Sequence, residues 1–116
     1  MYQTPSTMFT RRVKAWRHRF GCNDVIVLVA RRKNLGIREL VGRSRCPETA
    51  RARQIAMYLS HVVLRRNLRE VGLAFGRDRT TVSYACKLIE DLREDPGFDR
   101  ELSRMERYLE GRANVA

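Results

Sequence analysis

The stretch from Asn67 to Asp95 limits the possible folds of this chain more than any other. Asn67, followed three residues later by Glu70, is typical of a capping box, in which two side chains pair with backbone amides at the start of a helix. Gly76 breaks the short helix that follows, and Asp78 caps a second one that continues to about residue 93. A short helix, a glycine turn and a longer helix with a polar first turn predict a helix-turn-helix.

The second helix of this pair, residues 79–93, has two chemically different faces. Apolar side chains repeat at helical spacing on one face: Val82, Ala85, Cys86, Ile89 and Leu92. The other face carries short hydroxyls and long cations, namely Arg79, Thr80, Ser83 and Lys87, with Thr81 and Tyr84 at its margins. Such groups suit the base edges of the DNA major groove, and Arg77 in the turn is placed for phosphate. The alternative is a helical pair whose polar face only meets water.

The remaining segments predict an all-α fold. Apolar residues at helical spacing predict further helices, which we place at about residues 7–19, 24–33, 37–41, 48–65 and 98–110. Asn23 or Asp24 is the expected cap of the second of these, and Gly111 is expected to end the last. The run from Val25 to Val29 is β-branched, but no second such run can pair with it, so we expect a buried helix. We predict three parts: a basic amphipathic helix in 1–22, a compact helical domain in 23–112 and a disordered tail in 113–116.

The charge of the chain is strongly positive and unevenly distributed. It has 24 basic and 13 acidic side chains, for a formal net charge of +11. Residues 1–54 carry 13 basic and 3 acidic side chains, whereas residues 90–116 carry 5 basic and 8 acidic ones. Nucleic acid and anionic membranes are the partners that such a charge favours. The N-terminal helix is expected to pack on the domain through its aromatic stripe; membrane-surface or partner binding is the alternative.

The sequence predicts no catalytic or metal site. Three cysteines without a CxxC pair are not a disulfide framework, and they favour a reducing compartment such as the bacterial cytoplasm. The chain has only two histidines and no pair of closely spaced metal ligands beside them, so the sequence does not predict a metal site. No apolar run approaches the roughly 18 residues of a membrane span. No GxxxxGKS/T phosphate loop is present, so we expect no ATP binding, no cofactor, no small-molecule substrate and no enzymatic activity.

Several motifs resemble those of one known family. They are the start of the long helix, Arg53-Gln54-Ile55-Ala56-Met57, then the stretch Leu68-Arg69-Glu70-Val71-Gly72-Leu73-Ala74-Phe75-Gly76, and finally Arg77-Asp78-Arg79-Thr80-Thr81-Val82 with Ala85-Cys86. Together they are similar to the C-terminal DNA-binding domain, domain IV, of the bacterial replication initiator DnaA, over about residues 24–110. The resemblance implies an all-α helix-turn-helix fold and binding to double-stranded DNA.

The resemblance also implies roles for individual residues. The family's base-reading positions match Asp78, Thr80 and Thr81, and the outward face of the second motif helix adds Arg79 and Ser83 to the expected base-reading residues. Contacts with the DNA backbone are expected from Arg53, Gln54, Leu68, Arg69, Arg77 and Lys87. A minor-groove contact is expected from the basic loop, through Arg43 or Arg45. The sequence departs from the family motif at two places in or beside the helix at residues 79–93, which we call the reading helix. Arg79 replaces the histidine of the family motif, and one glycine before Arg77 is absent.

These observations leave three functions open. The chain is interpreted first as a sequence-specific transcription regulator, since similar domains occur in activators of gene transfer agent genes. Its protein partner in that role is RNA polymerase or a companion activator chain. The alternative is a replication initiation factor that acts at DnaA-type sites, and the third is a nucleoid protein without sequence preference. Arg79 favours regulation because it implies a changed binding site.

Overall fold

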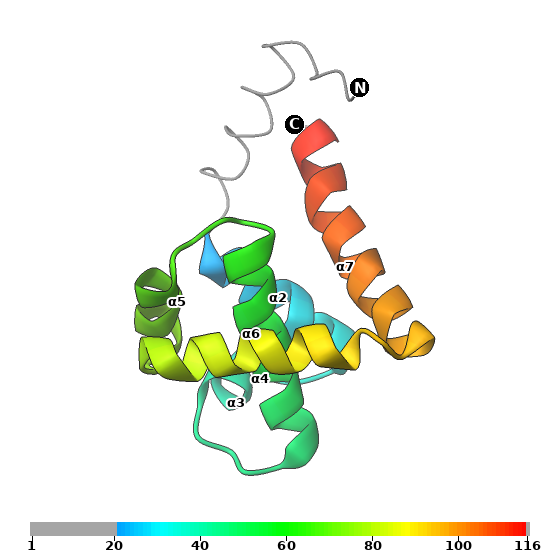
Figure 1. Cartoon of the computed structure of the whole chain (residues 1–116). Helices are drawn as coiled ribbons and strands as arrows, with labels where there is room; N and C mark the ends of the chain where they lie inside the picture. Colours follow the sequence, from blue (N-terminus) through cyan, green and yellow to red (C-terminus); the bar gives the residue numbers. More distant parts are fainter. Residues whose placement is uncertain (1–20, 116) are drawn as a thin grey trace, which may run out of the picture.

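The computed structural model describes residues 21–115, with side chains up to Gly111, and helices are the only regular elements in that part of the chain. They follow the order α2 (Cys22–Lys33), α3 (Ile37–Val41), α4 (Pro47–Val62), α5 (Leu68–Phe75), α6 (Arg79–Leu92) and α7 (Pro96–Val115). The predicted all-α class is therefore confirmed (Figure 1). The helix expected at about residues 7–19 lies outside the described residues.

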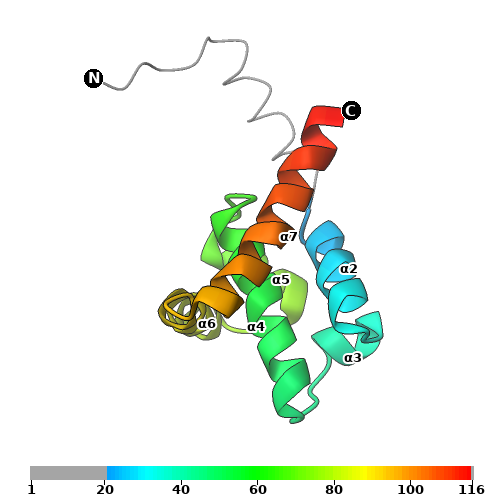
Figure 2. The same cartoon turned by 90° about the vertical axis from the view of Figure 1, so that its right-hand side faces the viewer.

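Helix α4 forms the centre of the domain, with α2 on one side and α6 on the other (Figure 2). Because it is covered from both sides, α4 is buried almost all round, including Ala52, Ile55, Ala56, Met57 and Leu59. The β-branched run of α2 lies in the core as a helix, as predicted, and only Val27 of that run is exposed. Apolar side chains of α7 complete the core: Leu102, Met105 and Leu109.

Three predicted helix ends differ from the structure. α2 begins before either expected cap: Gly21 is the N-cap, and the Asp24 carboxylate accepts a hydrogen bond from the Gly21 amide at 2.8 Å. α4 ends at Val62, not near residue 65, because Arg65 takes a left-handed conformation with φ of 61°. Val62 is exposed, although its spacing suggests an inward side chain, whereas Val63 and Leu64 just after it are buried. α7 continues through Gly111, so residues 113–115, expected in a disordered tail, are helical.

The helix-turn-helix has the predicted local geometry. The Asn67 side chain accepts from the Glu70 amide at 2.8 Å, and the Glu70 carboxylate accepts from the Asn67 amide at 2.9 Å, which confirms the capping box. Gly76 ends α5 with φ of 64°, in the left-handed region that favours glycine. The Arg77 amide then donates to the Gly72 carbonyl at 2.8 Å. These bonds fix the path of the chain from α5 into α6.

The other end of α6 is joined to α7 through Arg93. Its guanidinium donates to acceptors on α4 and α7, namely Tyr58, Asp99, Ser103 and Glu106. The hydrogen bonds that Arg93 donates to Glu106 are the largest reason why the pKa of Arg93 is raised. An ion pair between Lys33 and Glu101 also ties α7 to the end of α2. α7 is thus held at the end of α6 opposite to the helix-turn-helix turn (Figure 1).

Candidate nucleic-acid interface

The start of α6 is capped by Asp78, as predicted. Its Oδ1 accepts a hydrogen bond from the Thr80 amide at 3.3 Å. Hydrogen bonding to Thr80 lowers the pKa of Asp78, so this carboxylate is charged at neutral pH. Because Asp78 is also exposed, it both starts the helix and stands at the front of the candidate interface.

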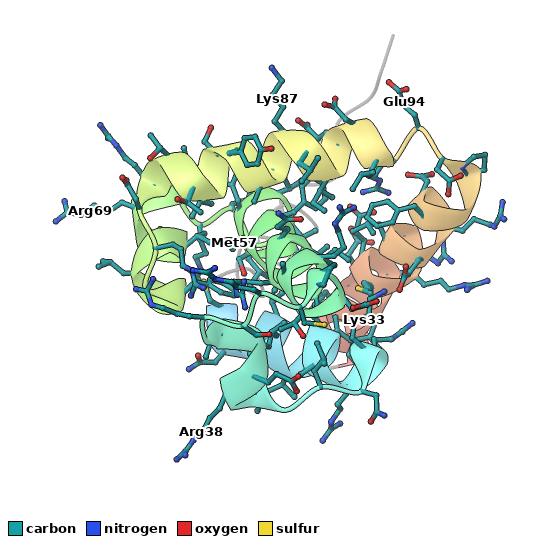
Figure 3. All side chains as sticks on the ribbon, turned by 90° about the horizontal axis from the view of Figure 1, so that it is seen from below. Lys33, Arg38, Met57, Arg69, Lys87 and Glu94 are labelled. Atoms are coloured by element: carbon teal, nitrogen blue, oxygen red, sulfur yellow. The ribbon has the colours of Figure 1, made fainter. Side chains whose placement is uncertain are left out.

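The outward face of α6 is open to solvent. All the base-reading candidates on the helix itself are exposed: Arg79, Thr80, Thr81 and Ser83. Lys87, further along, also projects away from the body of the molecule (Figure 3). Tyr84, expected at the margin of this face, is 68% exposed and lies between them. Its spacing of four residues from Thr80 is the sequence signal that places it on this face.

Arg53 is buried, in contrast to the surface position that a backbone contact suggests. Only 8% of the residue is exposed, and its Nε donates to the Leu40 carbonyl at 2.8 Å. Burial and, to a smaller extent, the neighbouring Arg77 lower the pKa of Arg53. Its Nη2 has no hydrogen-bond partner and no contact with solvent. Arg53 therefore has a structural role that the sequence does not indicate, and the DNA contact expected from it stays a prediction.

A small cavity of about 100 Å³ lies between α4 and α6, beside Arg53. Gln54 lines it from α4, and Thr81 and Tyr84 line it from α6. The Gln54 Oε1 is buried without a hydrogen-bond partner. Buried polar groups are usually paired with protein, water or a ligand. Since Oε1 is an acceptor, the partner that it lacks is a donor such as a water molecule, and Ala50, Met57 and Ala85 make much of the remaining lining apolar.

The Arg77 guanidinium binds backbone carbonyls of the protein, an arrangement that its expected role as a phosphate contact does not indicate. Its Nη1 donates to the carbonyls of Val41 and Phe75, at 2.7 and 2.8 Å. Its Nη2 donates to the Gly42 carbonyl at 2.7 Å. The physical reason is that the last carbonyls of a helix lack helical partners, and α3 ends within reach of this guanidinium. These acceptors use three of the five N–H donors of Arg77.

The basic loop between α3 and α4 displays both of its arginines, since Arg43 and Arg45 are exposed. The Cys46 amide donates to Ser44 Oγ at 3.2 Å, and the Cys46 thiol donates to the Glu48 carboxylate at 3.0 Å. That thiol contact lowers the pKa of Glu48. Short-range bonds thus order the end of the loop that joins α4, while both arginines stay available for a groove.

A surface hollow of about 360 Å³ lies between α5 and the start of α6. Arg69 and Arg79 line it, together with Leu73, which is 75% exposed. Exposure of Arg69 agrees with the geometry that a backbone contact requires. Leu68, by contrast, is partly buried against the core, so only part of its side chain remains for the contact expected from it.

Residues 22–89 match the family model described as the bacterial dnaA protein helix-turn-helix. The match runs from the start of α2 into α6 and covers more than half of the chain. The chain belongs to this family. The matched residues include every residue of the candidate interface, whereas α7 lies beyond them.

Relatives of this DnaA-family chain are chromosomal replication initiators. The DnaA protein of Mesorhizobium japonicum is 39% identical over 97 residues, which are 82% of this chain and 20% of the relative. DnaA 2 of Chlamydia pneumoniae is 32% identical over 96 residues, 82% of this chain and 21% of the relative. DnaA of Roseobacter denitrificans is 40% identical over 79 residues, 66% of this chain and 17% of the relative. The chain spans about a fifth of the length of these relatives.

Other kinds of site have little support in the described part of this DnaA-family chain. Within residues 21–111, His, Cys, Asp and Glu side chains form no group of three that could hold a metal ion. Among the helices α2 to α7, none has the length and apolar composition needed to cross a membrane. Cys86 faces the core, and burial raises its pKa to about 11, so its thiol is neutral and serves packing.

Proposed function

We propose that this chain binds double-stranded DNA and inserts the start of α6 in the major groove. The observation that carries the proposal is the exposed face formed by Arg79, Thr80, Thr81 and Ser83. Arginine pairs with O6 and N7 of guanine, and threonine can meet the methyl group of thymine. The first turn of α6 contains no acidic residue, and its amides are bonded to the N-cap Asp78, so the exposed side chains supply the groups that meet the bases.

The groups around α6 suit the sugar-phosphate backbone. Phosphate contacts position a protein on the duplex, whereas contacts with base edges specify the sequence. We assign backbone contacts to Arg69 and Lys87, which are exposed cations, and to Gln54 at the cavity beside α6. Arg43 or Arg45 supplies the minor-groove contact, because an arginine on an exposed loop suits a narrow, electronegative groove.

A role in replication initiation is the function that the relatives favour. Those described above are replication initiators, although the chain spans only about a fifth of their length. We infer that the chain acts at DnaA-type sites of a bacterial chromosome, in the cytoplasm, where it assists or competes with the initiator. We infer also that it acts by binding alone, without a cofactor and without catalysis.

Transcription regulation is the second candidate, and Arg79 is the residue that favours it. In the family motif this position is a histidine, whereas arginine is longer and offers two parallel donors. A different reading residue changes the preferred base and so directs the chain to other sites. In this role the bound chain requires a protein partner, either RNA polymerase or a companion activator chain.

Selection from random duplex DNA tests both sequence-specific binding and the reading role of Arg79. We expect the Arg79→Ala variant to lose a guanine preference at one position and about 1–3 kcal/mol on the preferred site. Arg104→Ala is the matched control, since Arg104 is an exposed arginine on α7, at the other end of α6. Absence of any motif in the wild type contradicts specific binding. If the wild type and Arg79→Ala select the same motif and the variant binds all sequences more weakly, Arg79 contacts phosphate and not a base.

Salt dependence tests the docking geometry. The exposed cations assigned to DNA are Arg43, Arg45, Arg69, Arg79 and Lys87. Five neutralised phosphates give a slope of about −4 to −5 for the logarithm of affinity against the logarithm of salt concentration. A slope shallower than about −2 contradicts this docking. Mapping of occupancy across the genome then separates the roles: the replication origin, promoters, or the whole chromosome for a nucleoid protein.

A further inference from the structure

Three successive carbonyls at the end of α3 accept hydrogen bonds from arginines that lie elsewhere in the sequence. Arg53 Nε donates to the Leu40 carbonyl at 2.8 Å, and Arg77 donates to Val41 and Gly42, both at 2.7 Å. The carbonyls at a helix C-terminus lack helical partners and carry the negative end of the dipole. Two cations therefore supply the partners that α3 lacks.

Arg77 links two parts of the candidate interface. Its backbone belongs to the turn of the helix-turn-helix, directly before Asp78, which caps α6. Its side chain reaches the carbonyls of Val41 and Gly42, directly before the basic loop. Arg43, the first arginine of that loop, is close enough to lower the pKa of Arg77, after the larger effect of burial. A single side chain thus connects the start of the reading helix with the start of the loop.

We propose that Arg77 is a positioning residue that holds the basic loop, residues 43–46, at a fixed distance from α6, so that loop and helix meet neighbouring grooves of one duplex in register. The inference rests on the proposed DNA binding and gives Arg77 no phosphate contact of its own. Helix α3 has five residues, too few to be stable without tertiary contacts, and it packs against α2 and α4. The Arg77 side chain directly connects the end of α3 with the turn of the helix-turn-helix.

The chemistry of arginine is suited to this bridge. A guanidinium presents donors in a rigid planar fork, so Nη1 and Nη2 can meet adjacent carbonyls at the same time. The ammonium of lysine is a compact point charge and lacks this fixed geometry. Arg77→Lys is therefore expected to keep the charge but lose the bridge, and Arg77→Met to lose both.

The first test uses the free protein and needs no DNA. In the wild type we expect backbone ¹⁵N order parameters near about 0.8 for residues 43–46, and in folded Arg77→Met values below about 0.6. Arg38→Met is the control, because Arg38 lies on the same helix α3 but points away from the body of the molecule (Figure 3). Wild-type order in both Arg77→Met and Arg77→Lys overturns the proposal. If Arg77→Met does not fold, Arg77→Lys alone decides.

The second test is a double-mutant cycle on the preferred duplex. We expect Arg77→Met to weaken binding about tenfold in the wild-type background, but less than about threefold when Arg43 and Arg45 are both alanine. Equal losses in the two backgrounds mean that Arg77 meets DNA independently of the loop, which overturns the positioning role. If the chain binds no duplex, the proposed function fails, while the order parameters of the free protein still decide whether Arg77 holds the loop.

Discussion

Replacement of Gly72 by alanine tests how closely the backbone of the turn packs against α5. Gly72 is buried in α5, and the turn passes directly over it. A Cβ at this position lies 2.5 Å from the Arg77 carbonyl oxygen, 3.5 Å from the Arg77 carbonyl carbon and 3.6 Å from the Arg79 amide nitrogen. All three are backbone atoms, so no side chain can rotate to make room. The turn has to move by about 0.9 Å to restore an ordinary contact of 3.4 Å.

The expected cost of Gly72→Ala follows from three effects. Overpacking that forces a backbone shift costs about 1–3 kcal/mol. Weakening of the hydrogen bond from the Arg77 amide to the Gly72 carbonyl adds up to about 1 kcal/mol. The higher helix propensity of alanine returns about 1 kcal/mol. Together they give a net loss of up to about 3 kcal/mol in the free energy of unfolding, and about 1.5 kcal/mol at the midpoints of the three ranges, with weaker DNA binding because α6 shifts relative to α5.

Urea unfolding measures this difference, and Gly111→Ala is the matched control. Gly111 also lies inside a helix, α7, but a Cβ there has no atom within 4 Å. Without a clash, only the propensity effect remains, so Gly111→Ala is expected to raise the free energy of unfolding by up to about 1 kcal/mol. The reasoning is refuted if Gly72→Ala is as stable as the wild type, or if both variants lose stability equally.

Three further predictions concern the cap of α6, the joint with α7 and nucleotides. Hydrogen bonding to Thr80 lowers the pKa of Asp78, so its stabilisation is present at neutral pH and is lost as the pH falls through that lowered pKa. Asp78→Asn should therefore be less stable than the wild type at neutral pH, and the difference should shrink as the pH falls below the ordinary aspartate pKa of about 3.9; a difference that stays constant in acid, measured by urea unfolding, contradicts this. Arg93→Met should cost about 2–4 kcal/mol because Asp99 and Glu106 lose their cation, whereas Arg104→Met should cost under about 0.5 kcal/mol in the same assay. Calorimetry should detect no ATP binding, and saturable micromolar binding would reveal a site that neither motif nor geometry indicates.

The outward face of α6 could be predicted from the sequence because it depends on local patterns. The capping box at Asn67, the glycine at residue 76 and the cap at Asp78 are short-range signals, and the structure has all three. Once the start of α6 is known, helical spacing decides which side chains are buried and which are exposed. Exact helix ends are harder to predict from the sequence because they depend on backbone angles, such as the positive φ of Arg65.

The inward positions of Arg53 and Arg77 could not be predicted, because they depend on acceptors distant in sequence. Arg53 bonds to a carbonyl 13 residues away, and Arg77 bonds to carbonyls 35 and 36 residues away. The sequence shows a cation beside a DNA-binding motif, which is also what a phosphate contact requires. Only the folded chain shows that α3 ends at this place, with carbonyls that lack helical partners.

The charges along α6 determine which of its ends can approach a duplex. Arg79 is the first residue of α6, at the positive end of the helix dipole, and Lys87 lies just past the middle of the helix. Exposed acidic side chains follow at its far end and in the turn to α7: Glu90, Asp91, Glu94 and Asp95. Phosphates repel that end and attract the start, so the helix has one favourable direction of approach. Because Arg53 and Arg77 are used inside the fold, this orientation depends on the few exposed cations near the start of α6 and on the basic loop that Arg77 holds beside it.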